Sequence, residues 1–300
     1  MIKKIDSGIL FMLASALISA FNGAIAKILS EDLSALEIVF FRNIFGVIII
    51  LYALKHTPPS LAGGKIHLLL SRGLLGFIAM ILFFYTITTI PLGEAITLNK
   101  TSPIFVSLIA YYFLKEQLNK QTILAIFIGF LGIIFITKPF GLTLSYEHIL
   151  GILGGFFAAS AYATIKTIRN IYDSRIIVLS FVGIGTILPA LLFLIAPYIE
   201  APKAILFLFP KFIIPNTIEI WFFIILMATI STLSQWLLTK AYSFSNASIV
   251  GVISYTNIPF AIGFGFMLGD KFPDFYTFLG IGLIILGGIL VGKIKNNTKQ

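Results

Sequence analysis

Apolar residues are grouped along the chain into about ten long runs, separated by short polar or proline-containing joints. The runs cover residues 8–28, 35–54, 67–88, 93–113, 121–137, 148–168, 176–196, 218–239, 247–268 and 276–292. A helix needs about 20 apolar residues to cross a bilayer, so each run is long enough, or nearly long enough, to span. Amides in lipid must bond within their own segment, and the runs do not alternate as barrel strands do. The pattern predicts an all-α integral membrane protein with ten transmembrane helices.

Composition agrees with a lipid environment, since 58% of the 300 residues are apolar and only 11% are charged. A soluble domain carries about 25% charged residues. The net charge of +9 is attributed to loops that face an anionic lipid leaflet, and no nucleic acid is expected as a partner. Without cysteine, no disulfide, Cys-ligated zinc or iron–sulfur cluster can form. The three histidines lack metal-site spacing and no P-loop motif is present, so we expect no metal, no cofactor and no direct use of ATP.

The positions of Lys and Arg between the runs predict the orientation. If the N-terminus is cytoplasmic, about thirteen basic residues fall on the cytoplasmic side, Arg72 among them, and only Lys138, Lys203, Lys211 and Lys271 fall outside. Such a bias is typical of inner-membrane proteins, whose cytoplasmic loops are enriched in Lys and Arg. We therefore expect a multi-pass inner-membrane protein with both termini in the cytoplasm.

The two halves of the chain resemble each other. The stretch from Ser102 to Glu116 aligns with that from Thr256 to Asp270, and the apolar runs that begin at Thr122 and Thr277 also align. Each half holds about five spans, an odd number, so the second half must be inverted relative to the first. Inverted repeats of this kind are typical of transporters, because they allow two related packings, one open to each side. The fold class predicted is two inverted five-helix repeats.

One stretch also resembles a known family. Residues 71–116 are similar to EamA-type members of the drug/metabolite transporter superfamily, in particular the G branch of the solute carrier 35 family and its bacterial relatives. The resemblance is carried by Arg72-Gly73, Phe84-Tyr85, Pro91-Leu92, Glu94-Ala95, Ser102-Pro103 and Lys115-Glu116. It implies ten helices around a central cavity, with EamA-like repeats at 1–138 and 147–293 and a cytoplasmic tail at 294–300. It implies no particular substrate, and Lys100 departs from the aromatic or apolar residue that relatives usually carry.

Ionisable residues within apolar runs indicate where a site lies, since each costs about 2.5–3.5 kcal/mol to insert. Arg42 lies roughly 10 Å into the second run at 1.5 Å per residue, and Lys100 lies at a similar depth in the fourth. These two are the candidate ligands for a negatively charged substrate group. Alternatively, Arg42 pairs with Glu37 or caps carbonyl groups. Lys27 ends the first run, from which it can extend to the interface.

Prolines interrupt the fourth and ninth runs at Pro103 and Pro259, each removing a backbone hydrogen bond. Broken helices with polar neighbours are typical of transport sites, although a plain kink is the alternative. We assign both prolines a possible gating role. The other candidate substrate-binding residues lie near these breaks or on neighbouring runs: Tyr85, Asn99, Thr101, Tyr162, Gln235, Trp236, Tyr255 and Asn257.

The sequence therefore predicts a secondary transporter of a small anionic or zwitterionic metabolite, a monomer or weak dimer in the lipid bilayer, working by alternating access. A membrane-embedded transferase acting on a lipid or acyl substrate is the alternative. Such an enzyme needs a polar cluster at the interface, for which the short cytoplasmic loops leave little room. No catalytic residue is assigned.

Overall fold

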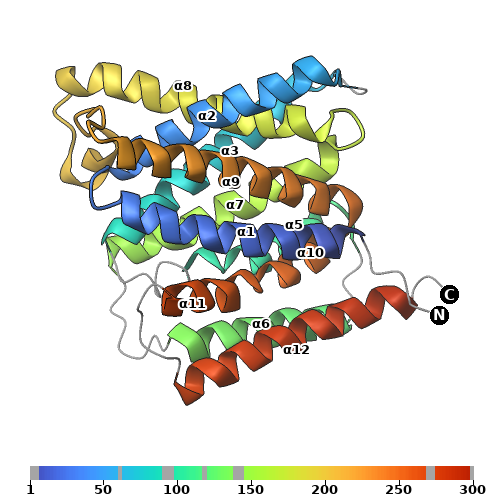
Figure 1. The fold of residues 1–300 in the computed structure, drawn as a ribbon. Coiled ribbons are helices and arrows are strands. Elements are labelled where there is room, and N and C mark those ends of the chain that lie inside the picture. The colour runs from blue at the N-terminus through green and yellow to red at the C-terminus, as the bar shows by residue number, and fades with distance from the viewer. Residues whose placement is uncertain are drawn as a thin grey trace.

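The computed structural model describes residues 7–59, 63–89, 98–116, 120–137, 145–267 and 274–297. In these ranges the chain is mainly helical and forms no β-strand (Figure 1). The elements are α1 (Ser7–Leu29), α2 (Ala35–His56), α3 (Ile66–Thr89), α5 (Ser102–Tyr112), α6 (Lys120–Thr137), α7 (Tyr146–Ile168), α8 (Ser174–Ile195), η1 (Ala196–Tyr198), η2 (Lys203–Leu208), α9 (Ile218–Phe244), α10 (Ala247–Ser254), α11 (Asn257–Met267) and α12 (Phe275–Asn297).

Seven membrane-crossing segments are evident in the described residues from length and hydropathy, with α10 and α11 together forming one of them. Three shorter apolar helices, α5, α6 and α12, accompany them. The helices begin close to the starts of the predicted runs, and ten spans fit this arrangement. The predicted runs ended too early in two cases, since α9 continues to Phe244 and α12 to Asn297.

The predicted fourth and ninth spans are both interrupted. The chain turns at Lys100 and Thr101 before α5, and again between α10 and α11; residues 90–97, at the start of the fourth span, lie outside the described part. Pro103 and Pro259 lie in the first turns of α5 and α11 rather than in helix interiors. A first-turn residue has no intrahelical partner for its N–H, so proline starts a helix there without loss. Each break therefore precedes its proline.

Helices pair in a regular way through the bundle. The pairs α1–α9, α2–α8, α3–α7 and α6–α12 are the most extensive contacts (Figure 1). The α2–α8 and α6–α12 pairs form opposite edges, with the other two pairs between them (Figure 1). At the α6–α12 edge a Cβ on Gly132 would lie 2.6 Å from the Gly280 carbonyl oxygen, so this close approach requires glycine.

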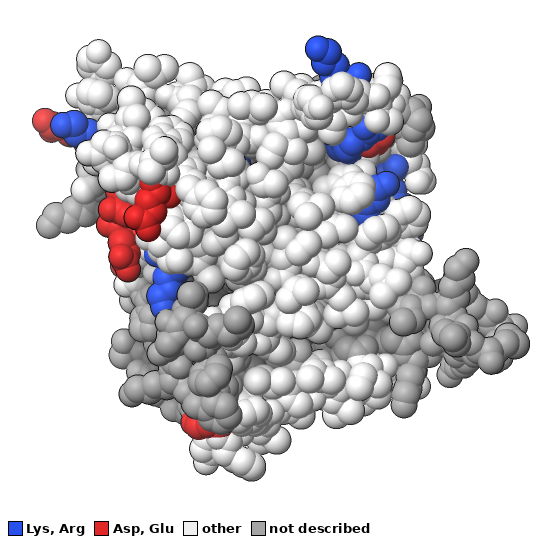
Figure 2. Space-filling view, viewed as in Figure 1, with Lys and Arg blue, Asp and Glu red and all other residues white. Residues whose placement is uncertain are grey.

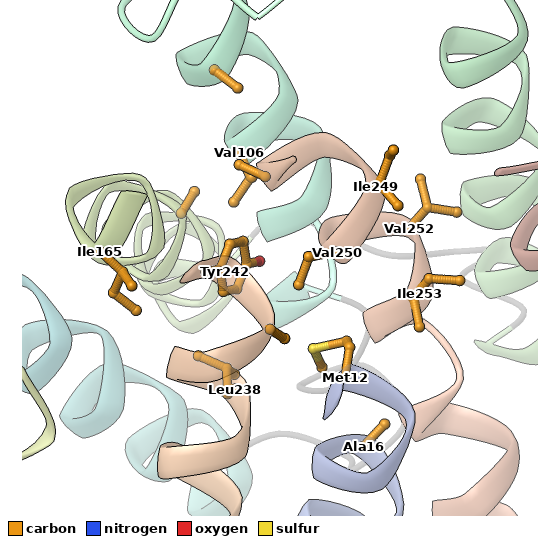
Figure 3. Packing of buried hydrophobic residues seen from close by; sticks show 14 of the residues in the cluster. Met12, Ala16, Val106, Ile165, Leu238, Tyr242, Ile249, Val250, Val252 and Ile253 are labelled. Atoms are coloured by element: carbon orange, nitrogen blue, oxygen red, sulfur yellow. The ribbon is translucent and has the colours of Figure 1, made fainter. Parts of the chain in front are cut away.

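Two apolar clusters fill the interior. One is centred on α2, α3 and α8. The other surrounds Tyr242, which lies among Ile165 of α7, Val106 of α5 and Val250 of α10 (Figure 3). This second cluster joins the break regions of the predicted fourth and ninth spans to the ends of α7 and α9.

Charged side chains lie at the two ends of the bundle, with an uncharged band between them on the face shown (Figure 2). We call the end where α1 begins the closed end, and the end where α1 stops at Leu29 the open end. In Figure 2, Lys and Arg gather at the closed end and most acidic residues at the open end. An uncharged band is what lipid tails require, and the chain is a multi-pass membrane protein.

Candidate functional site

A cavity of about 460 Å³ lies in the middle of the bundle, between α1, α3, α7, α9 and the two interrupted spans. Pockets of 300–1,000 Å³ hold small molecules in proteins. At the open end it is lined by exposed residues, namely Lys27 and Ile28 of α1 and Glu31 in the turn that follows. At its other end, Met12 and Tyr242 are buried. Among the described residues, the lining of the cavity is thus exposed at the open end and buried at the other.

Two arginines line this cavity. Arg42 of α2 is 6% exposed and Arg72 of α3 is 1% exposed. Their guanidinium carbons lie 5.6 and 4.8 Å from the centre of one ring, that of Phe181 in α8. The negative face of an aromatic ring attracts a cation at this distance. The ring therefore stabilises both charges partly, without neutralising either.

The alternative in which Arg42 pairs with Glu37 is not what the structure shows. Glu37 accepts hydrogen bonds from the backbone N–H groups of Ser34, at 2.9 Å, and Ile213, at 2.6 Å. Arg42 instead donates through Nη1 to the sulfur of Met80, a weak and uncharged acceptor. The carboxylate nearest in sequence is thus committed to capping α2 and anchoring the loop before α9.

Arg72 was not among the predicted site residues, because it was counted with the cytoplasmic loops. The signal was present in the spacing of α3. Arg72, Gly76, Met80, Phe83 and Ile87 follow one another at intervals of three or four residues, and all of them line the cavity. This spacing places them on one helix face. Gly76 has no side chain, and this leaves room on that face for the Arg72 guanidinium group.

Lys100 and Asn99 line the cavity from the turn that precedes α5. The helix break therefore brings the Lys100 ammonium group into the same space as the two arginines. Glu31, at the open end, is the one carboxylate among the described residues that lines this cavity. It lies one turn beyond Lys27, which leaves the three deeper cations without a facing acid in this part of the chain.

Three further predicted residues line the cavity on its opposite wall. Tyr162 of α7 stacks on Tyr242 with ring centres 5.0 Å apart. Gln235 of α9 presents a buried Oε1 that has no hydrogen-bond partner among the described residues. Asn257 of α11 donates to the carbonyl oxygen of Ala16 in α1 at 2.9 Å, which ties the second broken span to α1.

The remaining predicted residues do not line the cavity. Tyr85 stacks on Phe207 of η2, with ring centres 3.9 Å apart. Thr101 donates to the carbonyl oxygen of Leu98 within the helix break, at 2.6 Å. The other two pack elsewhere: Trp236 faces Lys240 at 5.6 Å, and Tyr255 is buried against α6. Pro103 and Pro259 act on the site only through the breaks they follow.

The closed end is held by polar contacts between three segments. Glu116, just after α5, lies 3.7 Å from the ammonium nitrogen of Lys166 in α7. That nitrogen donates to the carbonyl oxygen of Ser245 at 2.5 Å, and the N–H of Ala247 donates to Glu116 at 3.1 Å. These bonds join the ends of α5 and α7 to the α9–α10 junction, directly beyond the stacked tyrosines.

Comparisons with known proteins agree with this architecture. The chain matches the EamA-like transporter family over residues 6–138 and 145–293. It is 31% identical over 293 residues to the pseudopaline exporter CntI of Pseudomonas aeruginosa, covering 97% of this chain and 98% of the relative. It is 33% identical over 291 residues to an uncharacterized transporter of Helicobacter pylori, covering 95% and 94%.

The fold is also that of a solved crystal structure, which aligns with a TM-score of 0.77 at 13% sequence identity. The alignment covers 98% of this chain and 99% of the other. Since the matched relatives are transporters and not enzymes, the transferase alternative is not supported. The resemblance noted in residues 71–116 is confirmed over both halves, and the protein belongs to the EamA-like transporter family of multi-pass membrane transporters.

Proposed function

We propose that the protein is a secondary transporter that carries a small anionic or zwitterionic metabolite across the inner membrane. The observation that carries this proposal is the convergence of Arg42, Arg72 and Lys100 on one cavity, where Glu31 at the open end is the one carboxylate among the described lining residues. A buried charge is expensive unless it is paired. A carboxylate or phosphate of the substrate supplies the missing partner through charge-assisted hydrogen bonds.

The volume and the lining of the cavity also indicate the size of the substrate and a substrate surface that is partly apolar and partly polar. Its volume of about 460 Å³ suits a metabolite rather than an inorganic ion alone. The Tyr162–Tyr242 pair and Phe181 supply flat apolar walls, while Asn99 and Gln235 supply neutral polar groups. A zwitterion fits if its negative group meets the cations and its positive end lies toward the amides or Glu31.

Alternating access is supported by the symmetry of the helix contacts. If residues 1–138 and 147–293 form two inverted repeats, each helix corresponds to the one five spans later. The α1–α9 contact then corresponds to α7–α3, and the α1–α11 contact to α7–α5. The α2–α8 and α6–α12 pairs each correspond to themselves. Two halves related in this way have two equivalent packings, of which one opens the cavity at each end.

The charge distribution supports the orientation. Lys and Arg gather at the closed end, where α1 begins and α12 finishes (Figure 2). Basic residues are retained on the cytoplasmic side of inner-membrane proteins. We therefore assign the closed end, with both termini, to the cytoplasm. The cavity described here then opens outward.

Transport by purified protein in liposomes tests the proposal. A panel of labelled organic anions and amino acids is offered without ATP, and counterflow is measured for the wild type. Arg42→Gln and Lys100→Gln should weaken the apparent affinity for the transported compound by roughly tenfold or more, as expected for loss of a buried charge partner. Lys55→Gln is the matched control, because Lys55 is exposed at the end of α2 and lies outside the cavity. Unchanged affinity in both cavity variants would falsify the assignment.

A further inference from the structure

The two arginines that face Phe181 carry more positive charge than one monovalent ligand can balance. A guanidinium group cannot be deprotonated in a protein, so Arg42 and Arg72 together contribute two permanent charges. Both lie in the cavity wall and are less than a tenth exposed. They come from different helices, α2 and α3, and meet at one ring of α8.

Buried donor groups on both arginines lack hydrogen-bond partners. Nε of Arg42, and Nε and Nη1 of Arg72, make no hydrogen bond within the described structure. Such groups are rare, because leaving a buried donor unsatisfied costs the full desolvation of that group. Both cations are therefore left incompletely satisfied by the described chain, which leaves their positive charges to be balanced by a ligand in the cavity that both residues line.

Three carboxylates within spans or at span ends have partners elsewhere. Glu37 is held by Ser34 and Ile213, and Glu116 lies against Lys166 beyond the tyrosine pair. Asp173 is bound by Arg175 at the start of α8. Among the described carboxylates only Glu31, at the open end beyond Lys27, lines the cavity with the two arginines, and no hydrogen bond or ion pair of the described chain joins it to either of them.

From this charge balance, and on the basis of the proposed function, we infer that the substrate carries at least two negative charges, one held by Arg42 and one by Arg72. A substrate with a single carboxylate leaves one of the two positive charges unbalanced. A dicarboxylate or a phosphate monoester satisfies both. Lys100 adds a third cation at the helix break. This cation can bind a further negatively charged oxygen of the substrate.

Thermal unfolding of the purified protein tests the inference with defined probes. Succinate, its monoamide succinamate, inorganic phosphate and acetate are compared at equal ionic strength. The variants are Arg42→Gln, Arg72→Gln and, as matched control, Arg175→Gln, which removes the same charge outside the cavity. The shift in unfolding midpoint that each salt causes in the control is subtracted from the shift that it causes in each variant. This subtraction removes the general effect of the salt on stability. Succinate and phosphate as separate arms distinguish carboxylate from phosphate recognition.

We expect succinate or phosphate to bind the wild type roughly tenfold or more tightly than succinamate and acetate, given the usual effect of a buried charge partner. Either glutamine substitution should reduce this preference to about twofold, while Arg175→Gln keeps it. Arg42→Lys and Arg72→Lys retain the charge and should restore part of it, which separates charge loss from misfolding.

Equal binding of succinate and succinamate by the wild type, or absence of any dianion effect, overturns the inference. If the monoanions bind and Arg42→Gln abolishes that binding, the site still recognises anions, and only the requirement for two charges fails. Retention of the dianion preference in both glutamine variants also contradicts it, because the two arginines would then not be the recognition groups.

Discussion

Glu116 and Lys166 lie 3.7 Å apart across the closed end of the cavity, one on each half of the chain. Their side chains are only 10% and 15% exposed, and each also bonds the α9–α10 junction. An ion pair with further hydrogen bonds in partly buried surroundings is stronger than an exposed pair. This pair therefore stabilises the packing in which the closed end is shut.

Removing the Glu116 charge should weaken that closure. Glu116→Gln keeps the shape but leaves Lys166 without its carboxylate, and we expect a loss of about 2 kcal/mol in stability, the usual value for a hydrogen bond to a charged group. Thermal unfolding of the purified protein measures it. The control is Glu200→Gln, at an exposed position after α8. Equal stability of both variants and the wild type would show that the pair does not hold the closed end.

A methyl group at Gly76 should disturb the arginine site. The added Cβ would lie 2.3 Å from Nη1 of Arg72 and 2.6 Å from the Phe181 ring, closer than real atoms approach. Gly76→Ala therefore has to displace the guanidinium group or the ring, and substrate affinity should fall by roughly tenfold or more if the pair binds the anion. Binding titrations with the transported compound measure this effect.

Gly23 provides the matched comparison, since it lines the same cavity and a Cβ there would meet nothing within 4 Å. Gly23→Ala should retain affinity and, because alanine favours helix by about 1 kcal/mol over glycine, should not reduce stability. Equal affinity in the two alanine variants would argue against a role for the Arg72–Phe181 contact in binding.

The helix break before α5 should be sensitive to a substitution in α7. A Cβ on Gly155 would lie 2.5 Å from Oγ1 of Thr101 and 3.2 Å from the carbonyl oxygen of Leu98. The hydroxyl can rotate away but the backbone carbonyl cannot, so Gly155→Ala should shift the turn that carries Lys100. Transport kinetics should show a raised KM. Gly183→Ala in α8, which has open space around it, is the control, and identical kinetics in both would contradict a positioned break.

Acid should destabilise the start of α8. Asp173 caps this helix by accepting from the backbone N–H of Arg175 at 2.9 Å, and the hydrogen bond from the Arg175 side chain is the main cause of a lowered pKa for its carboxyl group. A pKa lower in the folded than in the unfolded state gives stability that is present at neutral pH. That stability is lost as the pH falls below about 4, through the folded pKa.

Asp173→Asn removes the titrating group, so the variant should start less stable at neutral pH and lose less on acidification. Unfolding midpoints between neutral pH and about pH 3.5 compare it with the wild type and with Asp32→Asn, an exposed control. A wild-type midpoint that falls with pH no faster than that of Asp173→Asn would show that Asp173 does not contribute.

Most of the helices were predictable because their apolar runs leave the backbone no other structure in lipid. The positions of Arg42 and Lys100 in the cavity also followed from depth along a run. The misplacement of Arg72 had a definite cause: it lies only six residues after the start of α3, where a cation can belong to either a loop or a site. The residues that follow Arg72 at intervals of three or four, Gly76 and Met80 among them, indicate that it belongs to the helix face that lines the cavity.

Side-chain direction was harder to predict for residues on helices that are apolar on every face. Trp236 and Gln235 are adjacent in α9, yet only Gln235 lines the cavity. Tyr255 points toward Gly129 of α6, and Tyr85 toward η2. Which face turns inward depends on close packing against neighbouring helices, and an all-apolar run contains no stripe that reveals it.

The proposed transport cycle requires that one cavity be reached from opposite sides of the membrane in turn. Because the chain has no native cysteine, single-cysteine variants can be labelled cleanly with a membrane-impermeant maleimide. Gly23→Cys reports the open end, and Ser248→Cys, whose hydroxyl lies 3.5 Å from Glu116, reports the closed end. Labelling is measured in intact cells and in inside-out vesicles, with and without Glu116→Gln. We predict that Gly23→Cys is labelled from outside and Ser248→Cys from inside, and that Glu116→Gln slows the first reaction while it accelerates the second. Labelling of both positions from the same side, or rates at both ends that Glu116→Gln leaves unchanged, would contradict alternating access through this cavity.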